Sequence, residues 1–411
     1  MNRPELLSPA GDLEKLKTAI DYGADAVYMG GENFSLRAGA GGFSYDEMLE
    51  GLKYAHERGK KCYLTVNIFA HNEDIEPLRE FLGEIKDFGF DGFLVSDPGI
   101  IGLVKEVIPD GELHLSTQAN MTNYLTAGFW YSLGVKRLVL ARELSLKEIR
   151  EIRDRIPEDM ELEAFVHGSM CISYSGRCLL SNFMANRDSN RGACAHPCRW
   201  KYVLEEEKRP GEYYPIEEDD RGSYIMNSRD LCMIDHIEEL CDAGISSLKI
   251  EGRMKSVFYV ATITNAYRMA IDAIMEGKYD EELAAYLRRE VRKVSHREFT
   301  TGFFYDKPNE KDQNYGSSNY TREYKFTGLV LGYDPESGYA LVEQRNKMTI
   351  GEEIEIFGPG KVFYKEVLLD MEDALTGEKL ESAPHPQQML RIKLEGGASP
   401  GDMIRKKSEG E

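Results

Sequence analysis

The chain has 411 residues, 42% of them hydrophobic and 30% charged, a composition typical of a globular protein with room for two domains or one large barrel with an appendage. No run of about 18 apolar residues occurs and the N-terminus lacks a secretory pattern, so we expect a cytoplasmic protein without a membrane segment. The 71 acidic and 51 basic side chains give a net charge of −20, which excludes a surface that is basic throughout but permits a local basic groove.

The first part of the chain alternates short apolar runs with amphipathic segments. Eight of the apolar runs have the length and composition of β-strands: 5–11, 25–31, 61–67, 92–97, 113–120, 137–144, 161–168 and 247–253. Helical patterns lie between most of them, and several end in a glycine just before the next strand. Eight strands alternating with helices predict a TIM-type (β/α)8 barrel, with a doubly wound open sheet as the alternative.

The pattern changes after the barrel. Residues 300–322 are polar and contain glycine and tyrosine, which is typical of a linker. From residue 323 onward, short alternating runs are separated by turn sequences such as GPG and SPGD. We therefore predict a barrel over 1–299 with a cysteine-rich insertion at 168–235, a linker over 300–322 and a small β-barrel domain over 323–411.

Five of the seven cysteines lie in one region: Cys171, Cys178, Cys194, Cys198 and Cys232. In a cytoplasmic chain such a group indicates a metal or cluster site rather than disulfides. The six residues between the first two cysteines exceed the spacing of zinc pairs, whereas an iron–sulfur cluster tolerates irregular spacing. A glycine two residues before two of the cysteines would let backbone N–H groups approach a cluster. The spacing favours a cluster, and zinc or ordinary thiols remain alternatives.

Polar residues at the carboxyl ends of barrel strands are candidate catalytic groups. Arg142, His167 and Glu251 occupy such positions, and Glu163 lies within the seventh strand. His167 could act as an acid, a base or a ligand, or it could be a hydrogen-bonded structural residue. If Glu163 points inward it needs a partner, and we expect Arg142 or Arg253 to supply one. No serine nucleophile elbow, HExxH motif, P-loop or dinucleotide fingerprint is present.

Residues 163–181, EAFVHGSMCISYSGRCLLS, closely resemble the signature of the collagenase-like peptidase family U32. The resemblance continues in ELLSPAG, NRGACAHPCRWKY, NSRDLC and LKIEGRMKS, and so covers nearly the whole chain. The family name implies a protease, but the sequence shows neither the pattern of an open His/carboxylate zinc site nor that of a catalytic Cys–His pair. Several members are implicated instead in oxygen-independent hydroxylation of RNA bases or of a quinone precursor, with a cysteine-held 4Fe–4S cluster.

The resemblance also implies a set of ligands. The cluster would be held by Cys171, Cys178, Cys194 and Cys232, with Cys198 as the alternative fourth ligand. The form of the chain is most similar to the branch of the family that makes 5-hydroxyuridine in tRNA, and that branch is linked to prephenate as a required metabolite.

We therefore expect an iron–sulfur-dependent, oxygen-independent RNA hydroxylase that acts on tRNA, alone, as a homo-oligomer or with a second family member. Arg37, Arg142 and Arg253 could hold a dicarboxylate such as prephenate, because guanidinium groups match carboxylates. The stretch 187–201 is basic, and Arg199 and Trp200 within it could contact and stack on RNA. The alternatives are a U32 peptidase and a non-catalytic RNA-binding scaffold with a structural metal.

Overall fold

The computed structural model describes most of the chain. The described residues are 2–31, 42–171, 173–200, 203–205, 213–215, 229–306 and 321–408.

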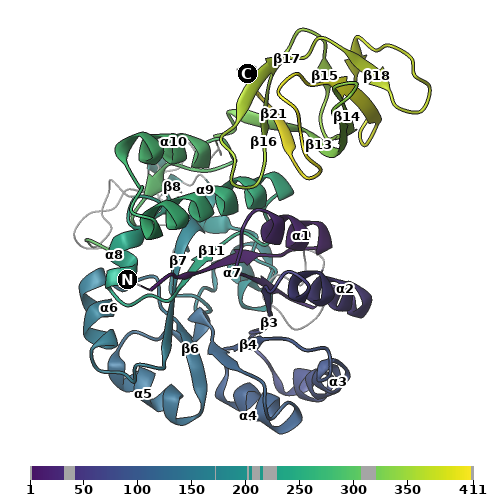
Figure 1. The fold of residues 1–411 in the computed structure, drawn as a ribbon. Helices are drawn as coiled ribbons and strands as arrows, with labels where there is room; N and C mark the ends of the chain where they lie inside the picture. The colour runs from purple at the N-terminus through teal and green to yellow at the C-terminus, as the bar shows by residue number, and fades with distance from the viewer. Residues whose placement is uncertain are drawn as a thin grey trace.

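Eight parallel strands form the central barrel (Figure 1). They are β1 (Glu5–Pro9), β2 (Ala26–Met29), β3 (Lys61–Val66), β4 (Gly92–Val95), β5 (Leu113–Leu115), β6 (Val135–Val139), β7 (Glu161–Ser169) and β11 (Ser247–Ile250). The last strand, β11, pairs with both β1 and β7 and so closes the sheet. The predicted (β/α)8 barrel is confirmed, and the open-sheet alternative is wrong.

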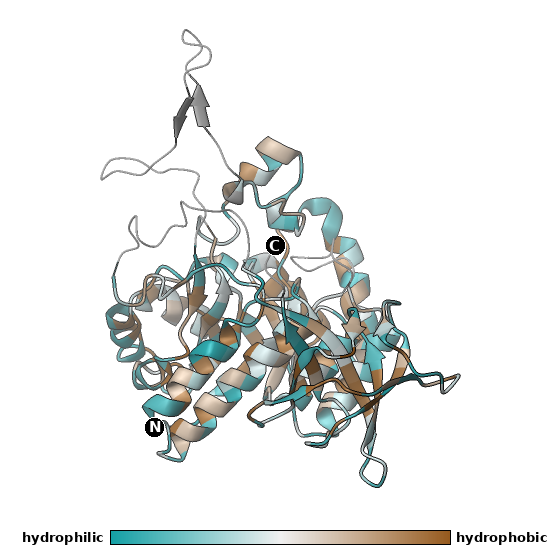
Figure 2. Cartoon of the chain, turned by 90° about the horizontal axis from the view of Figure 1, so that it is seen from above, coloured by the Kyte–Doolittle hydropathy of each residue, from teal (hydrophilic) through white to brown (hydrophobic). Residues whose placement is uncertain are grey.

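Helices cover the outside of the barrel. They are α1 (Leu13–Asp21), α2 (Tyr45–His56), α3 (Ile75–Ile85), α4 (Pro98–Val107), α5 (Tyr124–Ser132), α6 (Leu146–Arg153), α8 (Ile237–Asp242), α9 (Val257–Met275) and α10 (Glu281–Val291). Helix α2 begins with a capping box between Ser44 and Glu47. The outer helices carry both brown and teal segments in Figure 2, as expected when one face of each helix packs on the strands. No described helix is long and apolar enough to cross a bilayer.

A long insertion separates β7 from β11. Its described elements are α7 (Leu180–Ala185), the 3-10 turns η4 (Ser189–Arg191) and η5 (Pro197–Arg199), and the strands β8 (Val203–Glu205), β9 (Tyr213–Pro215) and β10 (Asp230–Cys232). Strand β10 runs antiparallel to β7, and β12 (Phe299–Thr300) pairs with β10. The barrel sheet is thus extended outward by two short strands that the sequence patterns do not reveal.

The C-terminal domain is built on a seven-stranded antiparallel sheet, in the order β17-β16-β21-β13-β14-β20-β18. The strands are β13 (Tyr324–Asp334), β14 (Tyr339–Gln344), β16 (Glu353–Phe357), β17 (Tyr364–Val367), β18 (Met371–Asp373), β20 (Met389–Lys393) and β21 (Met403–Lys407), with β15 (Met348–Thr349) and β19 (Ser382–Ala383) forming a separate pair. The predicted all-β character of this domain is confirmed.

The β-domain packs on α1, α9 and α10 (Figure 1). Phe258 of α9 stacks on Phe326 of β13, with 5.8 Å between the ring centroids. The Arg405 guanidinium is fully buried and donates to Glu290 of α10 at 2.7 Å and to Glu355 of β16 at 2.9 Å. Apolar and ionic contacts therefore both join the two domains.

Candidate functional site

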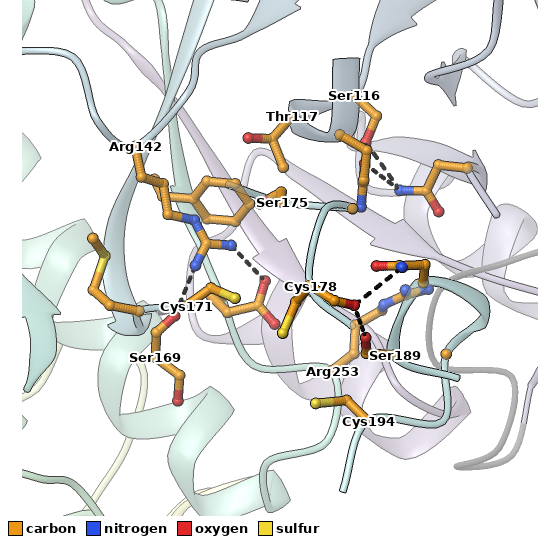
Figure 3. Close-up of a pocket in the computed structure, with 18 of the residues that line it drawn as sticks. Ser116, Thr117, Arg142, Ser169, Cys171, Ser175, Cys178, Ser189, Cys194 and Arg253 are labelled. Carbon is orange, nitrogen blue, oxygen red and sulfur yellow. Dashed lines mark hydrogen bonds and ion pairs between the residues drawn. The ribbon is translucent and has the colours of Figure 1, made fainter. Parts of the chain in front are cut away.

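A cavity of about 170 Å³ lies at the carboxyl ends of the barrel strands. In (β/α)8 barrels this end carries the active site. The volume is close to that of an engineered cavity of roughly 150 Å³ that binds benzene. The cavity therefore has room for at least one six-membered ring. Its walls come from the strand ends and from the cysteine-rich loop that follows β7 (Figure 3).

One half of the cavity is cationic. Arg142, just after β6, donates to the Ser169 carbonyl at 2.8 Å and lies 3.9 Å from the Glu251 carboxylate. Arg253, after β11, donates to the Thr65 hydroxyl at 2.9 Å. Figure 3 shows the two guanidinium groups on opposite sides of the same space. The structure thus brings together three of the expected site residues, Arg142, Glu251 and Arg253.

Lys249 of β11 adds a third cation to this half, although it was not among the residues expected from the sequence. Its ammonium lies 4.5 Å from the Tyr28 ring centroid and 5.4 Å from that of Phe165. The Arg142 guanidinium lies 4.0 Å from the centroid of the same Phe165 ring. The signal was present in the sequence, because Lys249 alternates along the strand with Glu251 and period-2 alternation places both on one face.

The other half is neutral and polar. Asn67, after β3, donates through Nδ2 to the Ser116 hydroxyl at 2.9 Å and to Gln118 Oε1 at 3.3 Å. The Ser116 hydroxyl also donates to Gln118 Oε1. Thr117, beside them in η3 (Thr117–Ala119), donates to the Leu140 carbonyl. This wall of amides and hydroxyls offers hydrogen bonds to an uncharged polar ligand.

Four cysteines of the loop after β7 line the cavity, namely Cys171, Cys178, Cys194 and Cys198. Figure 3 shows the first three around the same opening. The Cys178 carbonyl accepts from the Ser189 hydroxyl at 2.8 Å and from Asn190 Nδ2 at 3.2 Å. The backbone N–H of His196 points at Cys194 Sγ, 3.4 Å away. These contacts fix the backbone at Cys178 and place one N–H donor beside the Cys194 thiol.

The two glycines that precede cysteines adopt the backbone conformation expected of a close approach. Gly176 has φ +74° and Gly192 has φ +94°, both in the left-handed region. A Cβ atom on Gly176 would come within 3.1 Å of the Phe69 ring and 3.2 Å of the Gln118 side chain. A larger residue at Gly176 would therefore push the cysteine loop away from the barrel strands.

The cysteines of this loop line one cavity but do not form a ready-made site for a single metal ion. In the described part of the chain, no three His, Cys, Asp or Glu side chains lie close enough to hold a single metal ion. A group with several iron atoms, each bound by its own cysteine, needs four thiols around one space, and four cysteines line this cavity.

Cys232, which the resemblance implies as the fourth ligand, lies apart from this group. It is on β10, opposite His167 of β7, and burial raises the pKa of its thiol to about 12. Among the described residues that line the cavity, Cys198 is present and Cys232 is not. The structure thus places Cys198 in the same cavity wall as Cys171, Cys178 and Cys194. Which cysteine is the fourth ligand stays a prediction.

Glu163 lies beneath the cavity and not in its wall. Lys249 donates to Glu163 Oε1 at 2.7 Å, and Arg137 of β6 donates to Oε2 at 3.2 Å. Arg137 in turn pairs with Glu5 at the start of β1. Burial would raise the pKa of the Glu163 carboxyl, but Lys249 and Arg137 outweigh it and hold the pKa below its usual value. The expected partners Arg142 and Arg253 were therefore wrong; the carboxylate closes an ionic layer inside the barrel.

His167 is buried among aromatic rings behind β7. Its ring centroid lies 5.6 Å from that of Tyr267 and 5.3 Å from that of Phe299. The Tyr267 hydroxyl lies 3.4 Å from His167 Nδ1. Burial, helped by His296 and Lys255, lowers the pKa of His167 to about 3, so the imidazole is neutral at pH 7. This is the structural alternative that the sequence left open, and the ring does not line the described cavity.

The remaining expected contacts are only partly described. Arg37 and the side chain of Arg199 lie outside the described residues. Trp200 follows η5 with 46% of its surface exposed. It is available at the protein surface but is not part of the described cavity wall.

Fold and site together define a (β/α)8 barrel protein with a ligand cavity at its catalytic end, ringed by thiols, cations and amides. The chain belongs to peptidase family U32: residues 11–314 match the model of peptidase family U32, and residues 322–405 match the family's C-terminal domain. The resemblance carried by residues 163–181 is thereby confirmed.

Named relatives extend over nearly the whole chain. It is 42% identical over 404 residues to tRNA hydroxylation protein P1 of Bacillus subtilis, covering 98% of this chain and 95% of the relative. It is 40% identical over 427 residues to tRNA hydroxylation protein P of Escherichia coli, covering 93% and 92%. It is 36% identical over 337 residues to an Escherichia coli 23S rRNA 5-hydroxycytidine synthase, covering 80% of this chain and 48% of the relative.

Proposed function

We propose that this chain is an RNA-modifying hydroxylase that forms 5-hydroxyuridine in tRNA without molecular oxygen. The observation that carries the proposal is one cavity where cysteine thiols meet cations and amides. The names of relatives at 40% and 42% identity support RNA hydroxylation as the reaction class.

The cofactor in this proposal is a 4Fe–4S cluster. The donor set fits it, because four cysteines line the cavity and a backbone N–H already points at Cys194 Sγ. Gly176 and Gly192 give the loop the close backbone approach that such a group needs. The cluster would supply the electron chemistry that acid–base side chains cannot perform on a pyrimidine carbon.

The cationic half of the cavity would bind a carboxylate co-substrate of the prephenate type. Arg142 and Arg253 present guanidinium groups, and Lys249 lies at the base between the Tyr28 and Phe165 rings. Fork-shaped guanidinium groups pair with carboxylates, and the rings offer a flat surface to an unsaturated ligand. These residues would hold the co-substrate beside the thiols.

The rim of the cavity would contact the RNA backbone. Residues 171–200 contain four arginines and one aspartate, a local net charge of +3 in a chain of net charge −20. The Arg191 side chain is held in place by an ion pair with Asp74, with 2.7 Å between the charged atoms. The exposed ring of Trp200 is a surface on which a base can stack. A short single-stranded loop of RNA needs only such a local basic rim.

The test combines a gene deletion with anaerobic purification. We expect 5-hydroxyuridine to disappear from cellular tRNA on deletion, to return with the wild-type gene and not to return with Cys171→Ser. Cys241→Ser, on the outer helix α8, is the matched control and should restore the nucleoside. The purified protein should be brown with about four irons per chain. Unchanged tRNA nucleosides together with loss of a peptide-cleaving activity would instead favour a U32 peptidase.

The same material identifies the fourth ligand. The family resemblance implies Cys232 as the fourth ligand, whereas the residues that line the cavity include Cys198. Iron content measured for Cys198→Ser and for Cys232→Ser separates these two assignments, because only loss of a ligand should release the cluster or weaken its visible absorption.

A further inference from the structure

One amide in the neutral wall has a fixed orientation. Gln118 Oε1 accepts from Asn67 Nδ2 and from the Ser116 hydroxyl, so two donors hold this oxygen on the wall. Its amide nitrogen makes no hydrogen bond within the described residues, and the side chain lines the cavity. Gln118 therefore presents N–H donors, and no acceptor, to whatever occupies the cavity.

The backbone and stem of Gln118 are also held. Asn120, in the left-handed region at φ 53°, donates through Nδ2 to the Gln118 carbonyl at 2.7 Å and to the Ser175 carbonyl at 3.2 Å. Gly176 packs on the Gln118 stem so closely that a Cβ would lie 3.2 Å from it. Because its backbone and its stem are both held, the Gln118 amide is preorganised to form a specific hydrogen bond with a ligand.

We propose that Gln118 is the residue that selects uracil over cytosine, by donating a hydrogen bond to the exocyclic oxygen at C4 of the target base. The proposal rests on the proposed pyrimidine hydroxylation. Uracil carries an oxygen acceptor at C4, whereas cytosine carries an NH₂ donor there. A cytosine would set donor against donor inside a narrow cavity, which leaves both groups without an acceptor.

The position of Gln118 explains why it meets this edge of the base. Its stem packs against Gly176, two residues before Cys178, so the amide lies beside the thiol-bearing loop. For hydroxylation at C5 the C5 atom must face that loop, and the exocyclic group at C4 is its immediate neighbour on the ring. The base would lie along the neutral wall beside Gln118, which leaves the Phe165 and Tyr28 rings to the carboxylate co-substrate.

Binding of two short single-stranded RNAs that differ only in uridine or cytidine at the target position tests the proposal. The wild-type protein should prefer the uridine strand by roughly tenfold or more, the typical discrimination of one well-placed base contact. Gln118→Met keeps the length of the stem and removes the donor, so the preference should fall to within about twofold. Gln118→Glu presents an acceptor and should favour the cytidine strand. The ratio of affinities is insensitive to a uniform loss of folded protein.

A second variant reaches the same amide without changing it. Asn67→Asp replaces a donor to Gln118 Oε1 with an acceptor, so the amide should rotate and present its oxygen to the cavity. The base preference of the Asn67→Asp protein should therefore also shift toward the cytidine strand. A wild-type preference that survives in Gln118→Met and in Asn67→Asp would overturn the proposal.

The outcomes separate this proposal from the proposed function. If wild-type cells make 5-hydroxyuridine and Gln118→Met makes it with unchanged base preference, hydroxylation stands and the role of Gln118 is refuted. If wild-type protein neither binds either RNA nor supports any hydroxypyrimidine in tRNA, both proposals fail together.

Discussion

Replacement of Glu163 by glutamine separates a structural role from a catalytic one. The Glu163 side chain is fully buried and receives Lys249 at 2.7 Å and Arg137 at 3.2 Å. Arg137 keeps two further carboxylate partners, Glu5 at 2.5 Å and Glu161 at 2.6 Å. The Lys249 ammonium, only 4% exposed, has no second ion-pair partner in the described residues. Glu163→Gln therefore leaves one buried ammonium without a counter-ion.

Two limits set the size of the effect. Breaking a buried ion pair by removing one partner typically costs about 3–5 kcal/mol of unfolding free energy. The loss is capped by deprotonation of Lys249, because neutralising an amine of ordinary pKa 10.4 at pH 7 costs about 5 kcal/mol. We expect Glu163→Gln to lose about 3–5 kcal/mol, and the double variant Glu163→Gln/Lys249→Met to recover more than half of that loss, since the stranded charge is then absent.

The measurement is urea unfolding followed by the fluorescence of Trp130, a buried residue of helix α5. Conversion of tRNA uridine by each variant should be measured in parallel. A Glu163→Gln protein that unfolds within about 0.5 kcal/mol of wild type, yet makes no product, would refute the ionic-layer assignment and return Glu163 to the catalytic residues.

Three further predictions concern the interface, a buried imidazole and the cysteine loop. Arg405→Met leaves the Glu290 and Glu355 carboxylates with Lys293 as their shared cation. We therefore expect the unfolding free energy to fall by about 3 kcal/mol. The β-domain should unfold at a lower temperature than the barrel, which calorimetry would show as a second transition. Because His167 stays neutral in the folded state while the unfolded state binds a proton there, the unfolding free energy of the wild type should fall by about 2 kcal/mol from pH 6.5 to 5. In His167→Asn the number of protons taken up on unfolding should be smaller by about one, so the unfolding free energy should depend less on pH. An unchanged pH dependence in this variant contradicts the low pKa of His167. Gly176→Val should release the cysteine loop, measured as faster thiol labelling at Cys178, whereas Gly59→Ala on an open surface should not.

The barrel was predictable because its signals are local. Each strand is a short apolar run, and each following helix has its own cap or glycine stop. Helix α4 is harder to recognise, because residues 100–104 are mostly buried and show little amphipathic contrast. Strands β10 and β12 are two or three residues long and pair with partners distant in the sequence. Such pairings follow from the tertiary fold and leave no periodic pattern.

The site was predictable at the strand ends and not below them. Arg142, Glu251 and Arg253 reached the cavity because a position at the carboxyl end of a barrel strand is legible in the sequence. Glu163 could be assigned to the interior but not to a layer, since its height depends on the register that pairs Glu163 with Val139. Sequence spacing likewise groups the cysteines, but it does not decide which of them share one wall.

Lys249 belongs both to the ionic layer inside the barrel and to the wall of the cavity. Its ammonium closes the ionic layer through Glu163, and the same side chain forms the base of the cavity between the rings of Tyr28 and Phe165. A carboxylate bound above it would be the second anion near one ammonium. The carboxylate would therefore be held chiefly by Arg142 and Arg253, with Lys249 already neutralised from below. In the proposed binding mode, the carboxylate would leave the Lys249–Glu163 ion pair intact.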